Sequence, residues 1–123
     1  MNVMDDILKK WIDLVSVQDV DEVVNLYAKD GLLLGTFSDE IRGGHDQIKE
    51  YFIFFLAKKP KASIVESKIH IIDDNSFTVS GFYDFEVDSN NGKRELAHAR
   101  FTFVFKDKGQ GFTILSHHSS IMP

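Results

Sequence analysis

Hydrophobic residues in the first half of the chain recur at helical spacing in three places. The first stretch carries its apolar residues at Ile7, Leu8, Trp11, Leu14 and Val15. The second begins at Asp19 and ends at Asp30-Gly31, where glycine suits the residue that closes a helix. The third follows Gly43-Gly44 and ends before Pro60, which cannot continue a helix. Apolar residues three and four positions apart lie on one side of a helix, so the pattern predicts three amphipathic helices.

The rest of the chain has the pattern of strands. Residues 32–37 form a short apolar run of strand character between the second and third helices. From Ala62 onward the hydrophobic period changes to two, and turn residues gather at 73–75, 90–92 and 108–111. This spacing predicts four strands joined by hairpins. Helices first and an antiparallel meander second is the order typical of an α+β domain whose helices lie on one face of a curved sheet.

The turns also predict which residues share a face of the sheet. A two-residue Asn-Gly turn sets Tyr83 opposite Arg100, and pairing Phe105 with Phe112 in the next hairpin sets Arg100 opposite His117. On this register one face collects polar and aromatic side chains, namely Tyr83, Phe85, His98, Arg100, Thr102, His117 and Ser119.

The opposite face of the predicted sheet is apolar, and phenylalanine dominates it. The first face still holds large apolar side chains, and three short helices cannot cover both sides of a sheet. A second copy of the chain is therefore the expected cover. The pattern predicts a homodimer through an outer face made by Phe82, Phe101, Phe103, Phe105, Phe112 and Ile114.

Composition narrows the class of protein. The 123 residues carry 14 lysine and arginine against 19 aspartate and glutamate residues, a net charge of −5. Nucleic acid and anionic membranes attract clustered basic residues, so neither is an expected partner. Because the chain has no cysteine, disulfides and thiolate metal sites are excluded. We expect one domain over residues 1–123, in the cytoplasm, since no segment looks like a secretion signal or a membrane span.

Three residues are candidates for catalysis. Arg100 can stabilise a carboxylate or an oxyanion, and His117 or His98 can act as a general base near neutral pH. An arginine paired to a carboxylate and histidines bonded to the backbone would fit the same sequence equally well. The residues therefore leave open whether any reaction is catalysed.

A pocket between helices and sheet is usually aromatic with a few polar anchors. The residues expected to line it are Trp11, Tyr27, Tyr51, Tyr83, Phe85, His98, Arg100, Thr102, His117 and Ser119. Trp11 and Tyr27 each have a polar atom that needs a partner when buried. No metal site or other cofactor is expected, because His117 and His118 point to opposite faces and His98 has no evident third ligand nearby.

Two parts of the chain carry a family resemblance. They are Gly43-Gly44-His45-Asp46-Gln47-Ile48 and the strands Ala99-Arg100-Phe101-Thr102-Phe103 and Ile114-Leu115-Ser116-His117-His118-Ser119-Ser120-Ile121-Met122-Pro123. They resemble the NTF2-like superfamily, in the branch that groups SnoaL-like proteins with the association domain of calcium/calmodulin-dependent protein kinase II. The resemblance implies a cystatin-like cone of three N-terminal helices on a strongly curved antiparallel sheet, built from a short first strand and a four-stranded meander.

The resemblance also implies a pocket inside the cone and dimerisation by the outer face of the sheet. Arg100 matches, or lies one same-face step from, an arginine that lines the pocket of the kinase association domain. Ser119 stands where that domain has a second pocket arginine, so a doubly cationic anion site is not implied.

Three functions follow, because one fold of this kind hosts many activities. The first is a small homodimeric protein whose pocket binds a small organic molecule, preferably an anion. The second is a SnoaL-like isomerase, cyclase or hydratase that uses a pocket histidine as its base. The third is an oligomerisation module without ligand chemistry.

Overall fold

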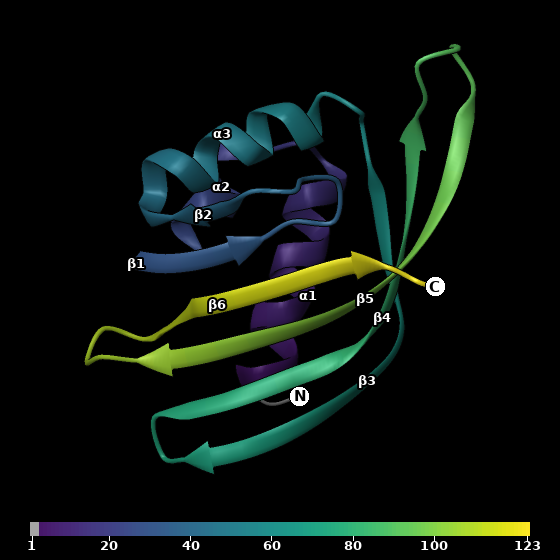
Figure 1. Ribbon diagram of the computed structural model, residues 1–123. Coiled ribbons are helices and arrows are strands. Elements are labelled where there is room, and N and C mark those ends of the chain that lie inside the picture. The colour runs from purple at the N-terminus through teal and green to yellow at the C-terminus, as the bar shows by residue number, and fades with distance from the viewer. Residues whose placement is uncertain (1–2) are drawn as a thin grey trace.

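A six-stranded sheet curves around three helices in the computed structural model, which describes residues 3–123 (Figure 1). The strand order across the sheet is β2-β1-β6-β5-β4-β3. Met1 and Asn2, which begin the domain expected over residues 1–123, lie outside the described residues. The elements are α1 (Val3–Ser16), α2 (Val20–Asn25), β1 (Tyr27–Leu34), β2 (Ile41–Gly43), α3 (Gly44–Leu56), β3 (Lys61–Asp73), β4 (Ser76–Asp88), β5 (Arg94–Asp107) and β6 (Phe112–Ile121).

The hydrophobic core lies between the helices and the concave face of the sheet. Trp11 of α1 stacks on Tyr83 of β4 with ring centroids 5.7 Å apart, and it meets Phe103 of β5 edge-on at 5.4 Å. Phe55 of α3 contacts Phe85 of β4 edge-on at 5.1 Å. In Figure 1, α1 lies behind the strands, so the viewer faces the convex side of the sheet, on which no described helix lies.

The structure confirms the predicted α+β class, the first and third helices and the four long strands. The second helix is shorter than predicted, because it ends at Asn25 and β1 begins two residues later. Tyr27 pairs in parallel with Ile114 of β6, and the Ile114 amide donates to the Leu26 carbonyl at 2.8 Å. A helix continuing through Gly31 would lose this pairing with the last strand.

The short strand β2 and the parallel pairing of β1 were not predicted. β2 pairs antiparallel with the end of β1, with Leu33 opposite Arg42. β1 in turn runs parallel to β6, with Leu33 opposite His117. The sheet is therefore mixed, and its first and last strands lie side by side.

The predicted register of the last three strands is wrong. The β4–β5 turn has three residues rather than two, since the Ser89 amide donates to the Lys93 carbonyl at 2.8 Å. Tyr83 consequently pairs with Ala99, one position away from Arg100. At the β5–β6 turn Phe112 pairs with Asp107 and not with Phe105, and the register shifts by one more residue between Val104 and Phe105. Together these two differences place His117 opposite Phe103 and not opposite Arg100.

A slip of one residue moves a whole set of side chains to the other face of a strand. Most of the residues expected to form an outer dimer interface are therefore buried in the chain's own core, namely Phe101, Phe103, Phe105 and Ile114. Phe112 also packs against this core. Phe82 alone of that set points outward, with 39% of its surface exposed.

The bulge in β3 depends on a glycine in the neighbouring strand. Gly81 of β4 pairs with Ser67 where the β3 register shifts, and a Cβ at Gly81 would lie 2.0 Å from the Glu66 carbonyl oxygen. Because this contact is with backbone, it is not relieved by rotating a side chain. Gly81 therefore permits the close approach of the two strands.

Replacing Gly81 with alanine is expected to destabilise the fold. Forcing extra volume into a packed site costs about 1–3 kcal/mol, so Gly81→Ala should lower the free energy of unfolding in urea by that amount. Ser63→Ala, at an exposed position of β3, is the control and should change it by less than about 0.5 kcal/mol. Equal unfolding midpoints for the two variants would contradict this account of the bulge.

Candidate functional site

A chain of polar side chains crosses the core of the cone. The Trp11 indole Nε1 donates to the Tyr27 Oη at 3.1 Å, and that hydroxyl lies 2.7 Å from the His117 Nδ1. The His117 Nε2 lies 3.2 Å from the Tyr83 Oη, which donates to the Ser119 Oγ at 2.5 Å. The Ser119 hydroxyl in turn contacts the hydroxyl of Thr36. The network joins α1, β1, β4 and β6.

Packing holds the His117 ring in place. Its imidazole stacks on the Phe103 ring with centroids 3.8 Å apart and meets Trp11 edge-on at 5.3 Å. His117 and Ser119 are two residues apart on β6, so both side chains point to the concave face. Burial lowers the pKa of His117 to about 3. The imidazole is therefore neutral at physiological pH.

The order of donors determines where the His117 hydrogen lies. The Tyr83 hydroxyl donates its one hydrogen to Ser119 and can only accept from His117, so the neutral ring carries its hydrogen on Nε2, and Nδ1 accepts from the Tyr27 hydroxyl. Burial raises the pKa of both Tyr27 and Tyr83 well above the usual value for tyrosine. The whole network is uncharged, and both imidazole nitrogens are occupied by protein hydroxyl groups.

A small cavity adjoins this network. The volume open to the centre of a water molecule is about 10 Å³, which is room for about one water. The cavity is closed by Tyr51, whose ring packs so closely over Gly35 that a Cβ there would lie 2.4 Å from it. The described residues that line it carry no formal charge, and they are Trp11, Leu33, Gly35, Thr36, Tyr51, Phe52, Phe55, Tyr83, Phe85, His117 and Ser119.

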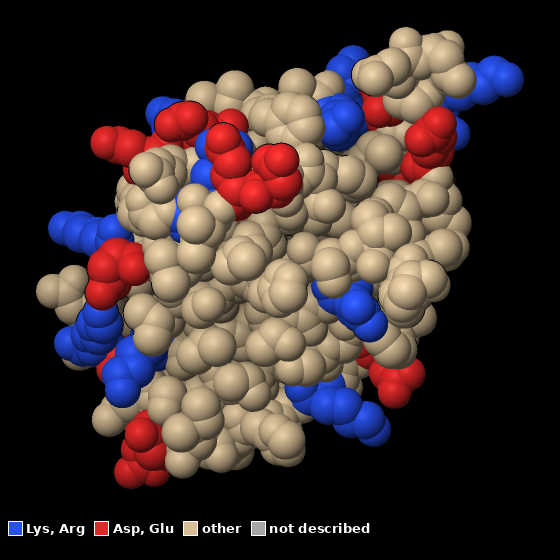
Figure 2. Space-filling model, in the orientation of Figure 1, with Lys and Arg blue, Asp and Glu red and all other residues tan. Residues whose placement is uncertain are grey.

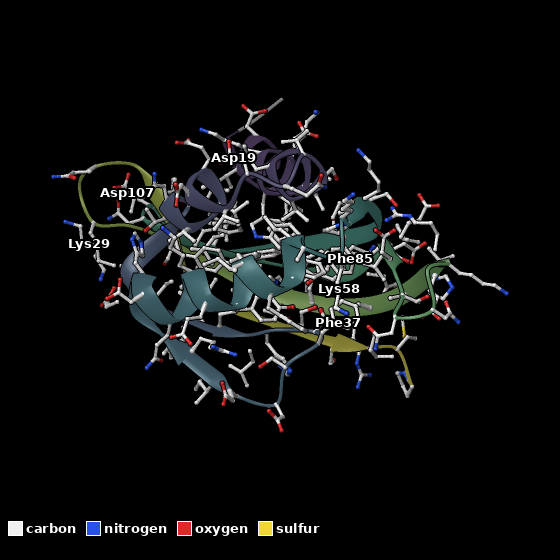
Figure 3. All side chains as sticks on the ribbon, turned by 90° about the horizontal axis from the view of Figure 1, so that it is seen from above. Asp19, Lys29, Phe37, Lys58, Phe85 and Asp107 are labelled. Atoms are coloured by element: carbon white, nitrogen blue, oxygen red, sulfur yellow. The ribbon has the colours of Figure 1, made fainter. Side chains whose placement is uncertain are left out.

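The end of the cone at which α3 terminates is closed by packed aromatic rings. Phe37 packs against Phe55 with centroids 5.5 Å apart, and the Lys58 ammonium lies 5.8 Å from the Phe37 ring centre. Figure 3 shows Phe37, Lys58 and Phe85 gathered at this end of the cone, whereas Lys29 and Asp107 lie at the opposite end. The interior is thus filled by side chains of the chain itself.

The predicted pocket residues fall into two groups. The structure brings together Trp11, Tyr27, Tyr51, Tyr83, Phe85, His117 and Ser119 around the network and its cavity. The other three, His98, Arg100 and Thr102, lie on the convex face, because the β4–β5 register differs from the predicted one. On that face the His98 Nδ1 lies 2.7 Å from the Asp84 Oδ1, and the Arg100 Nε donates to the Ser120 Oγ at 3.4 Å.

Sequence reasoning missed Gly35 and Thr36, which form one wall of the cavity. Both were included in a predicted strand but were not considered as site residues. A glycine within a strand pattern often marks the close approach of another group. That signal could have identified Gly35, whereas nothing in the sequence distinguishes Thr36 from other strand threonines.

Metal-binding clusters and membrane-spanning helices are both absent from the described part of the chain. The side chains described for residues 6–123 include no group of three or more histidine, aspartate or glutamate residues placed to hold a metal ion. Within the same range, no helix combines the length and the apolar composition that crossing a membrane requires.

The buried His117 predicts a specific dependence of stability on pH. An unfolded histidine has a pKa of about 6.5, so between that value and about 3 the unfolded chain binds more protons than the folded one. The free energy of unfolding should therefore fall as the pH falls through this range, by at most about 1.4 kcal/mol per pH unit from this residue. Urea denaturation at pH 7 and pH 5 measures the change.

Two variants separate His117 from other titrating groups. His117→Asn should be less stable at pH 7 but lose less stability between pH 7 and pH 5 than the unmodified protein. His70→Asn, at an exposed position, should keep the original pH dependence. If His117→Asn loses as much stability as the unmodified protein, another group carries the titration.

Comparisons with known proteins agree with this fold. The chain is similar to a putative calcium/calmodulin-dependent protein kinase II association domain from Xanthomonas campestris, with 38% identity and a TM-score of 0.91, over 98% of this chain and 86% of that one. It also resembles the association domain of C. elegans CaMKII, with 14% identity and a TM-score of 0.77, over 95% and 92% of the two chains.

A ketosteroid isomerase-like protein from Erwinia carotovora shares the fold at 15% identity and a TM-score of 0.81, over 98% of this chain and 95% of that one. No curated protein sequence matches the chain. Residues 2–123 match the family described as calcium/calmodulin dependent protein kinase II association domain. The chain, with its NTF2-like fold, therefore belongs to the calcium/calmodulin-dependent protein kinase II association domain family.

Proposed function

We propose that this protein is a self-associating domain that forms a homodimer through the convex face of its sheet. The observation that carries the proposal is the contrast between the two faces. The concave face is covered by the chain's own helices and its interior is filled, whereas no described helix covers the convex face. The apolar side chains that this face exposes, Leu34 and Phe82 among them, gain free energy when a second surface covers them.

A row of side chains crosses the centre of the convex face and carries little charge. Leu34 of β1 lies opposite His118, His118 lies opposite Thr102, and Thr102 lies opposite Ser80. The Thr102 and Ser80 hydroxyls are 3.0 Å apart. Figure 2 shows this face, on which uncharged side chains fill most of the middle and most of the acidic and basic side chains lie toward the rim. Charged residues also lie on this face, among them Arg100 of β5, Lys68 opposite Ser80 and Glu66 opposite Phe82.

The comparisons support the same proposal in a second way. The similar chain from Xanthomonas campestris and the more distant one from C. elegans are both described as association domains. In an isologous dimer each copy contributes the same patch, so one face of one chain is enough to specify the interface.

Charges placed in the central row are expected to prevent dimerisation. Thr102→Lys and Leu34→Lys each bring a cation against its own copy across a two-fold axis, where it would be desolvated and repelled. Light scattering coupled to size-exclusion chromatography should give a dimer for the unmodified protein and a monomer for each variant. Val17→Glu, an exposed position on the helical side, is the control and should remain dimeric. A dimer that survives both lysine substitutions would refute the convex interface.

Ligand binding inside the cone is the second candidate function. The cavity beside Tyr51 has hydroxyl groups of Thr36 and Ser119 in its wall, and such polar anchors are usual in small-molecule sites. A small organic molecule would fit only after the Tyr51 ring moves away from Gly35. The lining carries no cation, and Arg100 and His98 belong to the other face, so the cavity favours an uncharged molecule over the anion first expected.

Native mass spectrometry of the purified, unheated protein tests both candidates together. Self-association with a filled cone predicts a species of twice the 14.0 kDa chain mass and no additional mass. A constant extra mass on each chain would instead favour a ligand in the cone and would give its molecular weight.

A SnoaL-like reaction is less well supported by the geometry. His117 is neutral, and both of its nitrogens are bonded to tyrosine hydroxyl groups, so neither is free to take a proton from a substrate. His98, the other candidate base, pairs with Asp84 on the convex face. An enzymatic role is therefore less well supported than self-association or ligand binding inside the cone.

A further inference from the structure

The strand β5 extends beyond its neighbour β6. β5 begins at Arg94, but its first pair with β6 joins Ala99 to Ile121. One more hydrogen bond follows, from the Met122 amide to the carbonyl of residue 98 at 2.9 Å, and Pro123 has no N–H to continue the ladder. Within the described chain, residues 94–98 pair with β4 alone and form part of the hairpin arm at the upper right of Figure 1.

The open side of this segment presents unpaired backbone groups. The His98 carbonyl points toward the β6 side, and backbone groups in a strand point alternately to the two sides. Leu96 and Arg94 therefore direct their N–H and C=O groups to the same open side. Asp88, the β4 partner of Arg94, fits this alternation because its amide points away from β5, to the Lys58 carbonyl at 2.8 Å.

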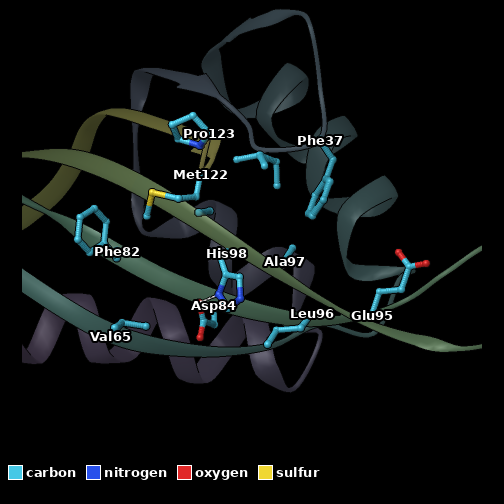
Figure 4. A pocket seen from close by; sticks show the side chains of 12 residues that line it. Phe37, Val65, Phe82, Asp84, Glu95, Leu96, Ala97, His98, Met122 and Pro123 are labelled. Atoms are coloured by element: carbon cyan, nitrogen blue, oxygen red, sulfur yellow. Dashed lines mark hydrogen bonds and ion pairs between the residues drawn. The ribbon is translucent and has the colours of Figure 1, made fainter.

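A groove of about 680 Å³ runs along this edge (Figure 4). Its apolar walls come from both faces of the sheet, with Phe82 and Leu96 on one face and Phe37 and Ala97 on the other. Leu96 is 55% exposed although it is a large apolar residue. Asp84 and Glu95 also line the groove, and the Asp84 carboxylate is paired there with His98.

We propose that the open edge of β5 binds an extended peptide segment that carries both apolar and basic residues. The peptide would add a strand in line with β6 and exchange main-chain hydrogen bonds with Leu96. Its alternate side chains would pack on Leu96 and Phe82 on one face and on Ala97 on the other. Glu95 provides the charge that favours lysine or arginine over acidic residues in the peptide.

This site differs from the interface proposed for self-association. The groove follows the edge of the hairpin arm, whereas the dimer row crosses the middle of the convex face through Thr102. The two sites adjoin at Phe82, which lies two residues from Ser80 on the same face, whereas Leu96 lies six residues from Thr102 along β5, so substitutions at Leu96 test the edge without changing the dimer row.

Fluorescence anisotropy with a designed peptide tests the proposal. The probe is the fluorescein-labelled, amidated peptide Lys-Val-Thr-Val-Lys-Val-Thr, and a second peptide has glutamate in place of both lysines. The unmodified protein should bind the lysine peptide saturably and at least about tenfold more tightly than the glutamate peptide. Absence of saturable binding, or equal affinity for the two peptides, would overturn the proposal.

Two substitutions at one position separate backbone pairing from side-chain packing. Leu96→Pro removes an N–H that faces the open side and takes no part in pairing with β4, so the hairpin arm should survive it. It should weaken peptide binding about tenfold or more, because it removes a hydrogen bond and blocks the edge. Leu96→Thr keeps the N–H and should bind more tightly than Leu96→Pro. Equal affinities of Leu96→Pro and the unmodified protein would contradict strand addition.

A modified peptide keeps the test decisive if Leu96→Pro fails to fold. Methylating alternate backbone nitrogens of the lysine peptide on its pairing side should abolish binding to the unmodified protein, and methylating the other set should not. Equal binding by the two methylated peptides would refute the strand geometry. If Leu96→Pro instead changes the number of subunits while the peptide does not bind, the edge pairs with a second copy and the peptide proposal is wrong.

Discussion

The hydrogen bonds of a single neutral histidine hold the interior of this domain together. His117 links Tyr27 at the start of β1 to Tyr83 in the middle of β4, and Trp11 extends the link to α1. Burying so many polar atoms is tolerable only because each has a partner, since an unmatched buried donor or acceptor costs about 1–3 kcal/mol. Stacking on Phe103 further restricts the ring, so its position and its hydrogen are both determined by protein groups. A residue held in this way stabilises the fold and is not available for acid–base chemistry.

The same network explains why the two faces of the sheet differ in their use. Polar groups on the concave side are paired with one another, and Tyr51 closes the remaining space over Gly35. On the convex side, the hydroxyl, imidazole and leucine side chains around Thr102 face outward. The family of the chain and this uncovered face both favour association as the role of the domain.

Much of the fold could be predicted from the sequence, and the site only in part. Period-two patterning and glycine-containing turns located the long strands, because both are local signals. The register failed because an Asn-Gly pair fits a two-residue turn, whereas Asn90 joins the loop that Ser89 and Lys93 close. Because the turn is one residue longer than predicted, the side chains of Arg100 and His98 lie outside the predicted pocket, on the convex face. Tyr83, His117 and Ser119 were still correctly grouped with one another. Each register error reverses the faces of one strand relative to β5, so the two errors cancel between β4 and β6.

The parallel pairing of β1 with β6 also affects how the chain acquires its structure. Leu33 and His117 are neighbours in the sheet, although most of the sequence separates them. Contacts between distant residues form slowly because the intervening chain must first close a large loop. The centre of the cone can therefore assemble only after the last strand has left the ribosome. Until then β1 has β2 as its only sheet neighbour among the described strands, and a nascent chain would expose Tyr27, Trp11 and Tyr83 to chaperones or to aggregation.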